Sequence, residues 1–169
     1  MPNAMTITTP TDREIVITRA FSAPIGLVWK SLTTPELLRK WLFLPPGWEM
    51  STCEEDVRAG GMFRWAWSSG GAPMMSMHGR YLEVSPPIPG SKSARLVRTE
   101  TFDTGCQPQA GEQHCTLTLT EELAAGSVRT TMRLTVVYPS KQARDAALAS
   151  GMEHGMRAGY DQLDAMLAG

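Results

Sequence analysis

The chain has 169 residues, of which 42% are hydrophobic and 20% are charged, and its formal net charge is −1. These values are typical of one globular domain that is large enough to bury a core. They do not favour a polyanionic partner such as nucleic acid, and no apolar run reaches the roughly 18 residues of a membrane span.

The first third of the chain predicts a leader, a strand and two short helices. Residues 1–12 are polar and rich in proline and threonine, which predicts a flexible leader. Arg13 to Phe21 contains β-branched residues and predicts a strand. Two helices follow, each opened by a proline that loses no hydrogen bond at an early helical position. They are expected at 24–32 and from Thr34 to the stop at Leu44-Pro45-Pro46-Gly47.

The remainder predicts six strands and one long helix. Short turns rich in glycine, and two longer polar loops, separate the strands, which indicates an antiparallel arrangement. We expect strands at 48–57, 62–67, 75–84, 95–102, 114–122 and 127–138, and a helix at 141–167. The predicted fold class is therefore α+β: a seven-stranded curved antiparallel sheet with a long C-terminal helix and two short helices after the first strand.

Three glycines in the predicted terminal helix stand four residues apart, at positions 151, 155 and 159. Each glycine destabilises a helix by roughly 1 kcal/mol relative to alanine. They line one edge of an apolar face that includes Met152, Met156 and Tyr160. Missing side chains at these points predict either a close approach to the sheet or room for a bound guest.

Short motifs in fixed order resemble the START-like superfamily (helix-grip, SRPBCC or Bet v 1-like), and within it the family of activators of the Hsp90 ATPase, homologue-1 type. They extend over about residues 13–167. The motifs are Arg19-Ala20-Phe21-Ser22-Ala23-Pro24, Val28-Trp29, Thr34-Pro35-Glu36, Trp41, Asp56-Val57-Arg58-Ala59-Gly60-Gly61, Phe63-Arg64, Gly79, Tyr81-Leu82-Glu83-Val84, Thr99-Glu100, Gly151-Met152-Glu153 and Gly155-Met156.

The resemblance implies one helix-grip domain over 13–169, with a cavity between a curved sheet and the terminal helix. In many members of the superfamily such a cavity holds a hydrophobic small molecule. Apolar pockets carry a few polar groups that orient the guest. The candidate ligand-binding residues are Trp41, Phe43, Phe63, Arg64, Trp65, Trp67, Met75, Met77, Arg98, Glu100, Phe102, Met132, Met152, Met156 and Tyr160.

Each of these residues also has a plainer interpretation. The apolar ones can form a packed core, and Arg98 with Glu100 can form a surface ion pair. Inside a cavity, the same pair could orient a carboxylate, a phenol or a carbonyl group. Glu100 and His78 are weak candidates for an acid or base. Cysteines 53, 106 and 115 are odd in number and irregularly spaced, which favours reduced thiols, a cytoplasmic protein and no metal site.

We therefore predict a binder of a lipid-like, polyketide-like or aromatic molecule, with no cofactor, metal, nucleic-acid partner or membrane span. Two alternatives remain open. One is an enzyme of the aromatase/cyclase or hydratase kind, in which a buried acid or base moves protons. The other is an interaction module for an Hsp90-type chaperone. The predicted state is a monomer or a homodimer.

Overall fold

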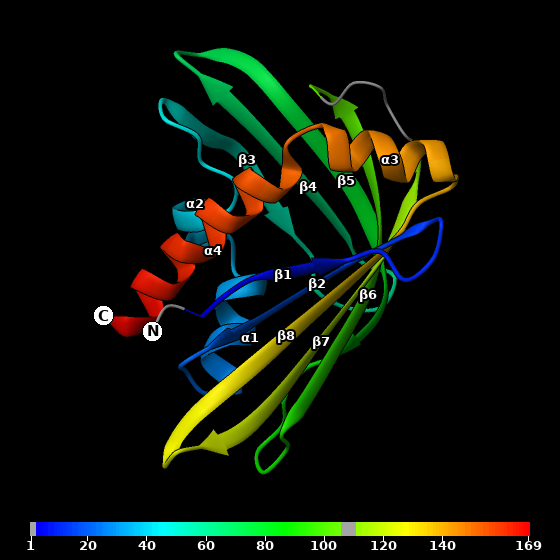
Figure 1. Ribbon diagram of the computed structural model, residues 1–169. Helices are drawn as coiled ribbons and strands as arrows, with labels where there is room; N and C mark the ends of the chain where they lie inside the picture. The colour runs from blue at the N-terminus through cyan, green and yellow to red at the C-terminus, as the bar shows by residue number, and fades with distance from the viewer. Residues whose placement is uncertain (1–2, 106–110) are drawn as a thin grey trace.

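The computed structural model describes residues 3–105 and 111–169. It confirms an α+β fold built on one antiparallel sheet, in the strand order β1-β2-β8-β7-β6-β5-β4-β3 (Figure 1). The elements are β1 (Thr6–Thr8), β2 (Glu14–Phe21), α1 (Ile25–Thr33), α2 (Pro35–Trp41), β3 (Trp48–Glu55), β4 (Met62–Ser69), β5 (Ala72–Ser85), β6 (Ser93–Thr104), β7 (Gln113–Ala124), β8 (Ser127–Val137), α3 (Lys141–Ala149) and α4 (Met152–Ala168).

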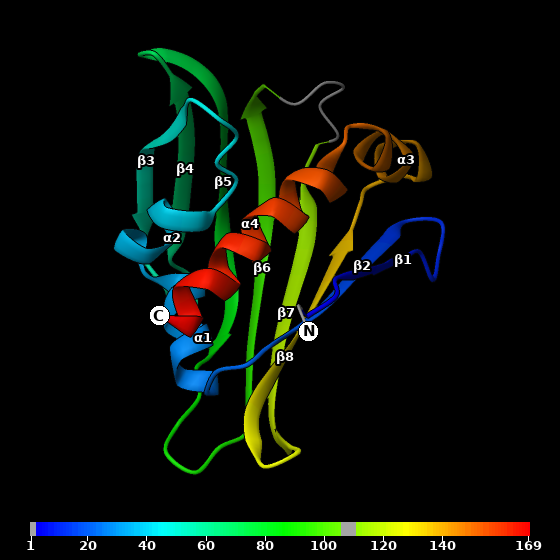
Figure 2. The ribbon, with the colours of Figure 1, turned by 60° about the vertical axis from the view of Figure 1, so that its left-hand side comes forward.

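The sheet curves around α4, and the short helices cross its open side. Strand β2 lies near one edge and β3 forms the other, so the intervening α1 and α2 carry the chain across the concave face. Figure 2 shows α4 running in front of the central strands, with α2 beside it. Because α1, α2 and α4 all lie on this side, inward side chains of the strands are buried beneath them.

Alternation along the strands separates the two faces of the sheet. Phe63, Trp65 and Trp67 of β4 point to the concave side and are buried, whereas Arg64 between them is exposed on the convex side. In β7, Cys115 and Leu117 are buried in the same way. Successive side chains of a strand point to opposite faces, so the aromatic row that the sequence left unplaced faces the helices.

The predicted terminal helix is in fact two helices, which corrects the expectation of one helix over 141–167. Helix α3 begins where the side chain of Ser140 accepts a hydrogen bond from the backbone N–H of Ala143, at 3.1 Å. It ends before Gly151, whose φ of 83° is left-handed and starts α4 in a new direction. The apolar spacing continues from Leu148 to Met152, so periodicity alone does not reveal the break.

The other two glycines allow close approach, but to the segment after α2 and not to the sheet. A Cβ atom at Gly155 would lie 2.3 Å from Cε2 of Phe43, and one at Gly159 would lie 3.1 Å from the carbonyl oxygen of Trp41. Phe43 itself has a positive φ of 49°, which is uncommon for a bulky residue. The glycines therefore make room for residues 41–43, and they leave no glycine-lined gap for a guest.

The sheet has eight strands instead of the predicted seven. The additional strand, β1, lies in the segment for which the sequence predicts a flexible leader, and it pairs antiparallel with β2. Met5, just before it, is buried. Pairing with an edge strand satisfies the backbone groups of this segment without a long apolar run. Of the three cysteines, Cys106 lies outside the described residues.

Candidate functional site

A charged pair lies on the concave face of β6. Arg98 Nε donates a hydrogen bond to Glu100 Oε2 at 2.8 Å, and the two side chains are only 12% and 8% exposed. The guanidinium of Arg98 lies over the rings of Phe63 and Trp65, at 5.3 Å and 5.0 Å from their centroids. Residues two apart in a strand share a face, so both charged side chains enter the interior together.

Neighbouring strands supply further polar groups to this pair. Gln113 of β7 donates from Nε2 to Glu100 Oε1 at 2.9 Å. On the other side, Glu55 at the end of β3 accepts from Trp65 Nε1 at 2.8 Å and from the hydroxyl of Tyr81. We refer to Glu55, Tyr81, Arg98, Glu100 and Gln113 as the polar cluster. Its members lie on four strands, β3, β5, β6 and β7, in an otherwise apolar interior.

Burial and neighbouring charges shift the pKa values of residues in and beside the polar cluster. Burial by itself would lower the pKa of Arg98, but the carboxylate of Glu100 outweighs it and the pKa is raised, so the guanidinium stays charged. Burial raises the pKa of Glu55, against the lowering effect of the hydrogen bond from Tyr81. Burial also raises the pKa of Cys115, which lies opposite Arg98 in the β6–β7 register.

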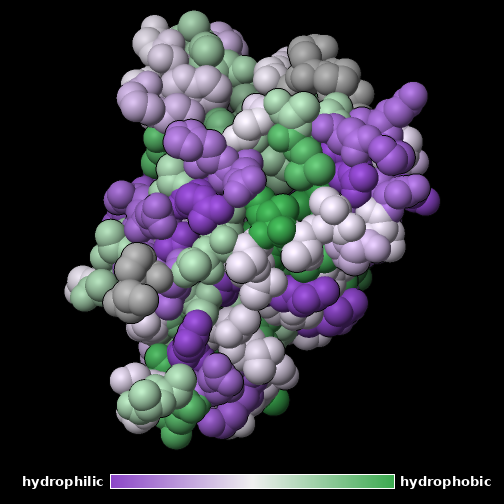
Figure 3. All heavy atoms as spheres, in the orientation of Figure 1, coloured by the Kyte–Doolittle hydropathy of each residue, from purple (hydrophilic) through white to green (hydrophobic). Residues whose placement is uncertain are grey.

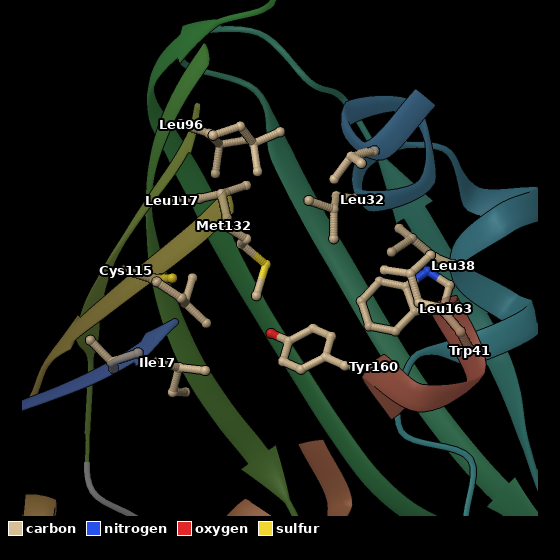
Figure 4. Packing of buried hydrophobic residues seen from close by; sticks show 14 of the residues in the cluster. Ile17, Leu32, Leu38, Trp41, Leu96, Cys115, Leu117, Met132, Tyr160 and Leu163 are labelled. Carbon is tan, nitrogen blue, oxygen red and sulfur yellow. The ribbon is translucent and has the colours of Figure 1, made fainter. Parts of the chain in front are cut away.

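Tyr160 covers this region from α4. Its ring contacts Trp41 and Phe21 at centroid distances of 5.7 Å and 6.1 Å. In Figure 4 its hydroxyl end points from α4 toward Met132 and Cys115 on the sheet. The residue is only 5% exposed, yet its hydroxyl makes no hydrogen bond to any described residue. Buried tyrosine hydroxyls normally have a partner, so this hydroxyl keeps the capacity to donate and accept a hydrogen bond.

The structure brings most of the predicted ligand-binding residues together and excludes one. Arg64 is exposed on the convex face, away from the others. His78 also lies on that face, where its Nδ1 is 2.9 Å from Asp103. The buried concave set is Trp41, Phe63, Trp65, Trp67, Met77, Glu100, Met132 and Tyr160, with Arg98 almost buried, and the half-buried set beside it is Phe43, Met75, Phe102, Met152 and Met156.

Sequence reasoning missed Glu55, Tyr81, Gln113 and Cys115 as members of the site. Gln113 and Cys115 precede Leu117 and Leu119 with a spacing of two, so the alternation of β7 was a signal that placed them inward. Tyr81 follows Met77 and Gly79 with the same spacing of two, and the register is unbroken from Met77 to Tyr81, so the alternation of β5 was a comparable signal.

Two hollows among the described residues lie away from the space between α4 and the polar cluster. One, of about 370 Å³, is on the convex face between Glu54, Arg64 and His78. The other, of about 440 Å³, lies at the C-terminal end of α4 beside Arg19 and Asp164. Figure 3 shows hydrophobic side chains at the surface between α3, α4 and β1, next to the start of α4.

The family model of activator of Hsp90 ATPase homolog 1-like proteins matches residues 22–168, which is nearly the whole chain. The chain belongs to this family. The match includes both short helices, the polar cluster and all of α4. Membership in the activator of Hsp90 ATPase homolog 1-like family confirms the resemblance drawn from the motifs, and it places the fold among helix-grip domains that bind ligands.

Solved structures of bacterial proteins share the fold. A Rhodobacter sphaeroides protein is 32% identical, with a TM-score of 0.81 over 98% of this chain and 99% of its own. A Nitrosomonas europaea protein is 25% identical, with a TM-score of 0.68 over 95% and 98%. An Arthrobacter aurescens protein, 22% identical with a TM-score of 0.75 over 96% and 91%, is similar in fold alone. No curated protein matches the chain.

Two further properties of this family member bear on its chemistry. Within residues 3–105 and 111–169, the His, Cys, Asp and Glu side chains form no group of three or more that could hold a metal ion. In the same part of the chain, no helix is both long and apolar enough to cross a membrane.

Proposed function

We propose that this protein binds a hydrophobic or aromatic small molecule between the concave face of the sheet and α4. The observation that carries the proposal is a polar cluster held among aromatic rings, together with the unpartnered hydroxyl of Tyr160 above it. A buried ion pair contributes little stability compared with an apolar replacement. Its presence in the interior is explained if a guest uses the polar surface there.

Binding requires an opening, because Glu100 and Gln113 are buried beneath the helices. The N-terminal half of α4 is the part suited to move. Met152 and Met156 are only half-buried there and pack against the core, and methionine side chains adapt to irregular apolar surfaces. Gly151 at the start of α4 has the left-handed conformation of a helix break. A guest would displace the two methionines and contact the polar cluster below them.

Nile red, an uncharged dye that fluoresces in apolar surroundings, provides the test. We expect saturable binding by the wild-type protein and loss of binding in Met156→Arg, which puts a charge on the face of α4 one turn before Tyr160. The matched control is Leu123→Arg, at a side chain that is 68% exposed and remote from α4. Equal binding by both variants, or none by the wild type, would refute the proposal.

The two alternatives give different results in parallel experiments. An enzyme of the cyclase or hydratase kind needs a free acid or base, and Glu55 is the strongest candidate because burial raises its pKa. Both of its oxygens already accept hydrogen bonds, which favours binding over proton transfer. A chaperone-related role is suggested by the description of the family. Stimulation of an Hsp90-type ATPase without any Nile red binding would support that role instead.

A further inference from the structure

We infer that residues 3–13, which we call the strap, hold α3 and α4 over the sheet and act as a gate for the entry of a guest. The strap comprises β1, the residues before it and the turn into β2. This inference rests on the proposed binding between α4 and the sheet, and it adds the route by which a guest reaches that space. It follows from what the strap contacts and from how little of it is buried.

The strap contacts both terminal helices, one on each side of the break at Gly151. Arg144 of α3 donates from Nη1 to the carbonyl oxygen of Thr11, at 2.7 Å. Arg157 of α4 donates from Nη1 to the carbonyl oxygen of Met5, at 3.4 Å. In Figure 1, β1 runs from near the C-terminal end of α4 toward α3. One segment therefore joins two helices that meet at a glycine with left-handed backbone.

The strap itself is held to the sheet by few contacts. Strand β1 pairs with β2 over only three residues, Thr6–Thr8. Of residues 3–13, all of which the structure describes, only Met5 is buried. Segments with few buried apolar contacts open locally at a low cost in free energy. The strap is therefore suited to detach while the rest of the domain stays folded.

Detachment of the strap uncovers an apolar seam beside the first half of α4. Ile7 of the strap, and Met152 and Met156 of α4, are half-buried and pack against the core. Figure 3 shows hydrophobic side chains at the surface in this place, between α3, α4 and β1. A guest that enters through the seam meets the two methionines that the proposed binding displaces.

The second half of α4 is held more firmly than the first, so we place the entry at the first half. Residues 152–158 include no buried residue, whereas Tyr160 is only 5% exposed. Arg19 of β2 also pairs with Asp161, at 2.9 Å, and with Asp164. The strap thus supplies contacts to the half of α4 that the core holds least.

A disulfide that locks the strap to β2 tests the gate. Thr6 and Thr18 are directly opposite each other in the β1–β2 register, and the Cα atoms of such residues are about 4.5–5.5 Å apart, a separation that a disulfide spans. The variant is Thr6→Cys/Thr18→Cys with Cys106→Ser, since Cys53 and Cys115 are buried. Stopped-flow fluorescence should show Nile red association at least about tenfold slower in the oxidised than in the reduced form, because entry needs the local opening that the bond prevents. The affinity should stay nearly unchanged, since a gate slows entry and exit alike.

Hydrogen exchange tests the strap without any guest. Arg144→Met removes the donor to Thr11. The matched control is Lys141→Met, because both basic side chains contact Asp145 on α3 but only Arg144 of the two contacts Thr11. Amides of the strap and of residues 152–158 should exchange about tenfold faster in Arg144→Met than in Lys141→Met, through loss of one charged hydrogen bond.

The outcomes separate the gate from the binding proposal. Nile red binding at equal rates in the oxidised and reduced forms would overturn the gate and leave the proposed function standing. Equal exchange in the two α3 variants would show that the strap does not hold the helices. Absence of Nile red binding by the wild type would refute the proposed function, and the gate with it.

Discussion

Two arginines buried on the concave side of the sheet form ion pairs of different kinds. Arg19 of β2 pairs with Asp161, at 2.9 Å, and with Asp164, both on α4. Arg98 pairs with Glu100, two residues further along the same strand. Both guanidiniums lie over aromatic rings. Arg19 therefore fixes the helix to the sheet, whereas the ion pair of Arg98 lies within one strand.

This difference separates a buried ion pair that holds two elements of the fold together from one whose role must be sought in function. A pair between distant elements determines their arrangement, and its removal changes tertiary structure. A pair within one strand has no such role, and apolar residues of similar volume often replace a buried pair without loss of stability. The location of Arg98 and Glu100 is then explained by what they contact when a guest is bound.

The largest expected effect comes from breaking the pair in β6. Arg98→Met leaves Glu100 buried without a cation and should lower the free energy of unfolding by about 3–5 kcal/mol. The double variant Arg98→Met/Glu100→Leu removes both charges, and its stability should return to within about 1 kcal/mol of the wild type. Urea unfolding measures both. A double variant as unstable as the single one would show that the pair supports the fold.

A second experiment tests the other contact that holds α4. Gly155→Ala would bring a Cβ atom against the ring of Phe43, and overpacking of this kind destabilises by about 1–3 kcal/mol. Removing the ring in Phe43→Ala should make the same glycine substitution neutral or favourable, because alanine is the better helix former. Urea unfolding of the four proteins gives the coupling energy, for which we expect about 0.5–3 kcal/mol. Additive effects would contradict the contact.

A third prediction concerns pH and Glu55. Its pKa in the folded protein is raised above the ordinary 4.5, chiefly by burial. The folded state therefore holds the proton more tightly than the unfolded state, and stability falls as pH rises from about 4.5 through the folded pKa. Glu55→Gln cannot titrate. The unfolding free energy of the wild type minus that of the variant should decrease over this interval, as measured by urea unfolding at several pH values.

Asp145 on α3 provides a control of opposite sign. Hydrogen bonds from Lys141 and Arg144 lower its pKa. Any contribution of its ionised form is present above the unfolded pKa and is lost as pH falls through the folded one. The difference between wild type and Asp145→Asn should therefore increase with pH. A difference for Glu55 that also increases would show that its buried carboxylate is stabilised as the ion.

The sequence predicted the strands well because their signals are local. Alternation in β7, and the turn at Gly126, are each contained within a few residues. The break at Gly151 was missed because the apolar spacing passes across it, and β1 was missed because three residues paired to an edge strand need no apolar pattern. The partners of Gly155 and Gly159 could not be predicted, since Phe43 and Trp41 reach them only through the tertiary fold.

The candidate site was predicted only in part, for the same reason. Arg98 and Glu100 were identified as a pair on one face of a strand, but their burial depends on Phe63 and Trp65 of another strand. Glu55 meets Tyr81 across three strands, and no local pattern connects them. Arg64 was included because it stands between aromatic residues, and alternation then places it on the opposite face.

The smallest expected effect is that of removing Arg64, which lies on the convex face of the sheet, in contrast to Arg98 on the concave face. Arg64 is exposed, and it forms no ion pair with any described residue, so Arg64→Ala should change the free energy of unfolding by less than about 0.5 kcal/mol. Nile red affinity should also be unchanged, because the side chain lies on the convex face. If Arg64→Ala instead weakened binding tenfold or more, the convex hollow beside His78 would be the binding site, and the cluster around Arg98 would lose its proposed role.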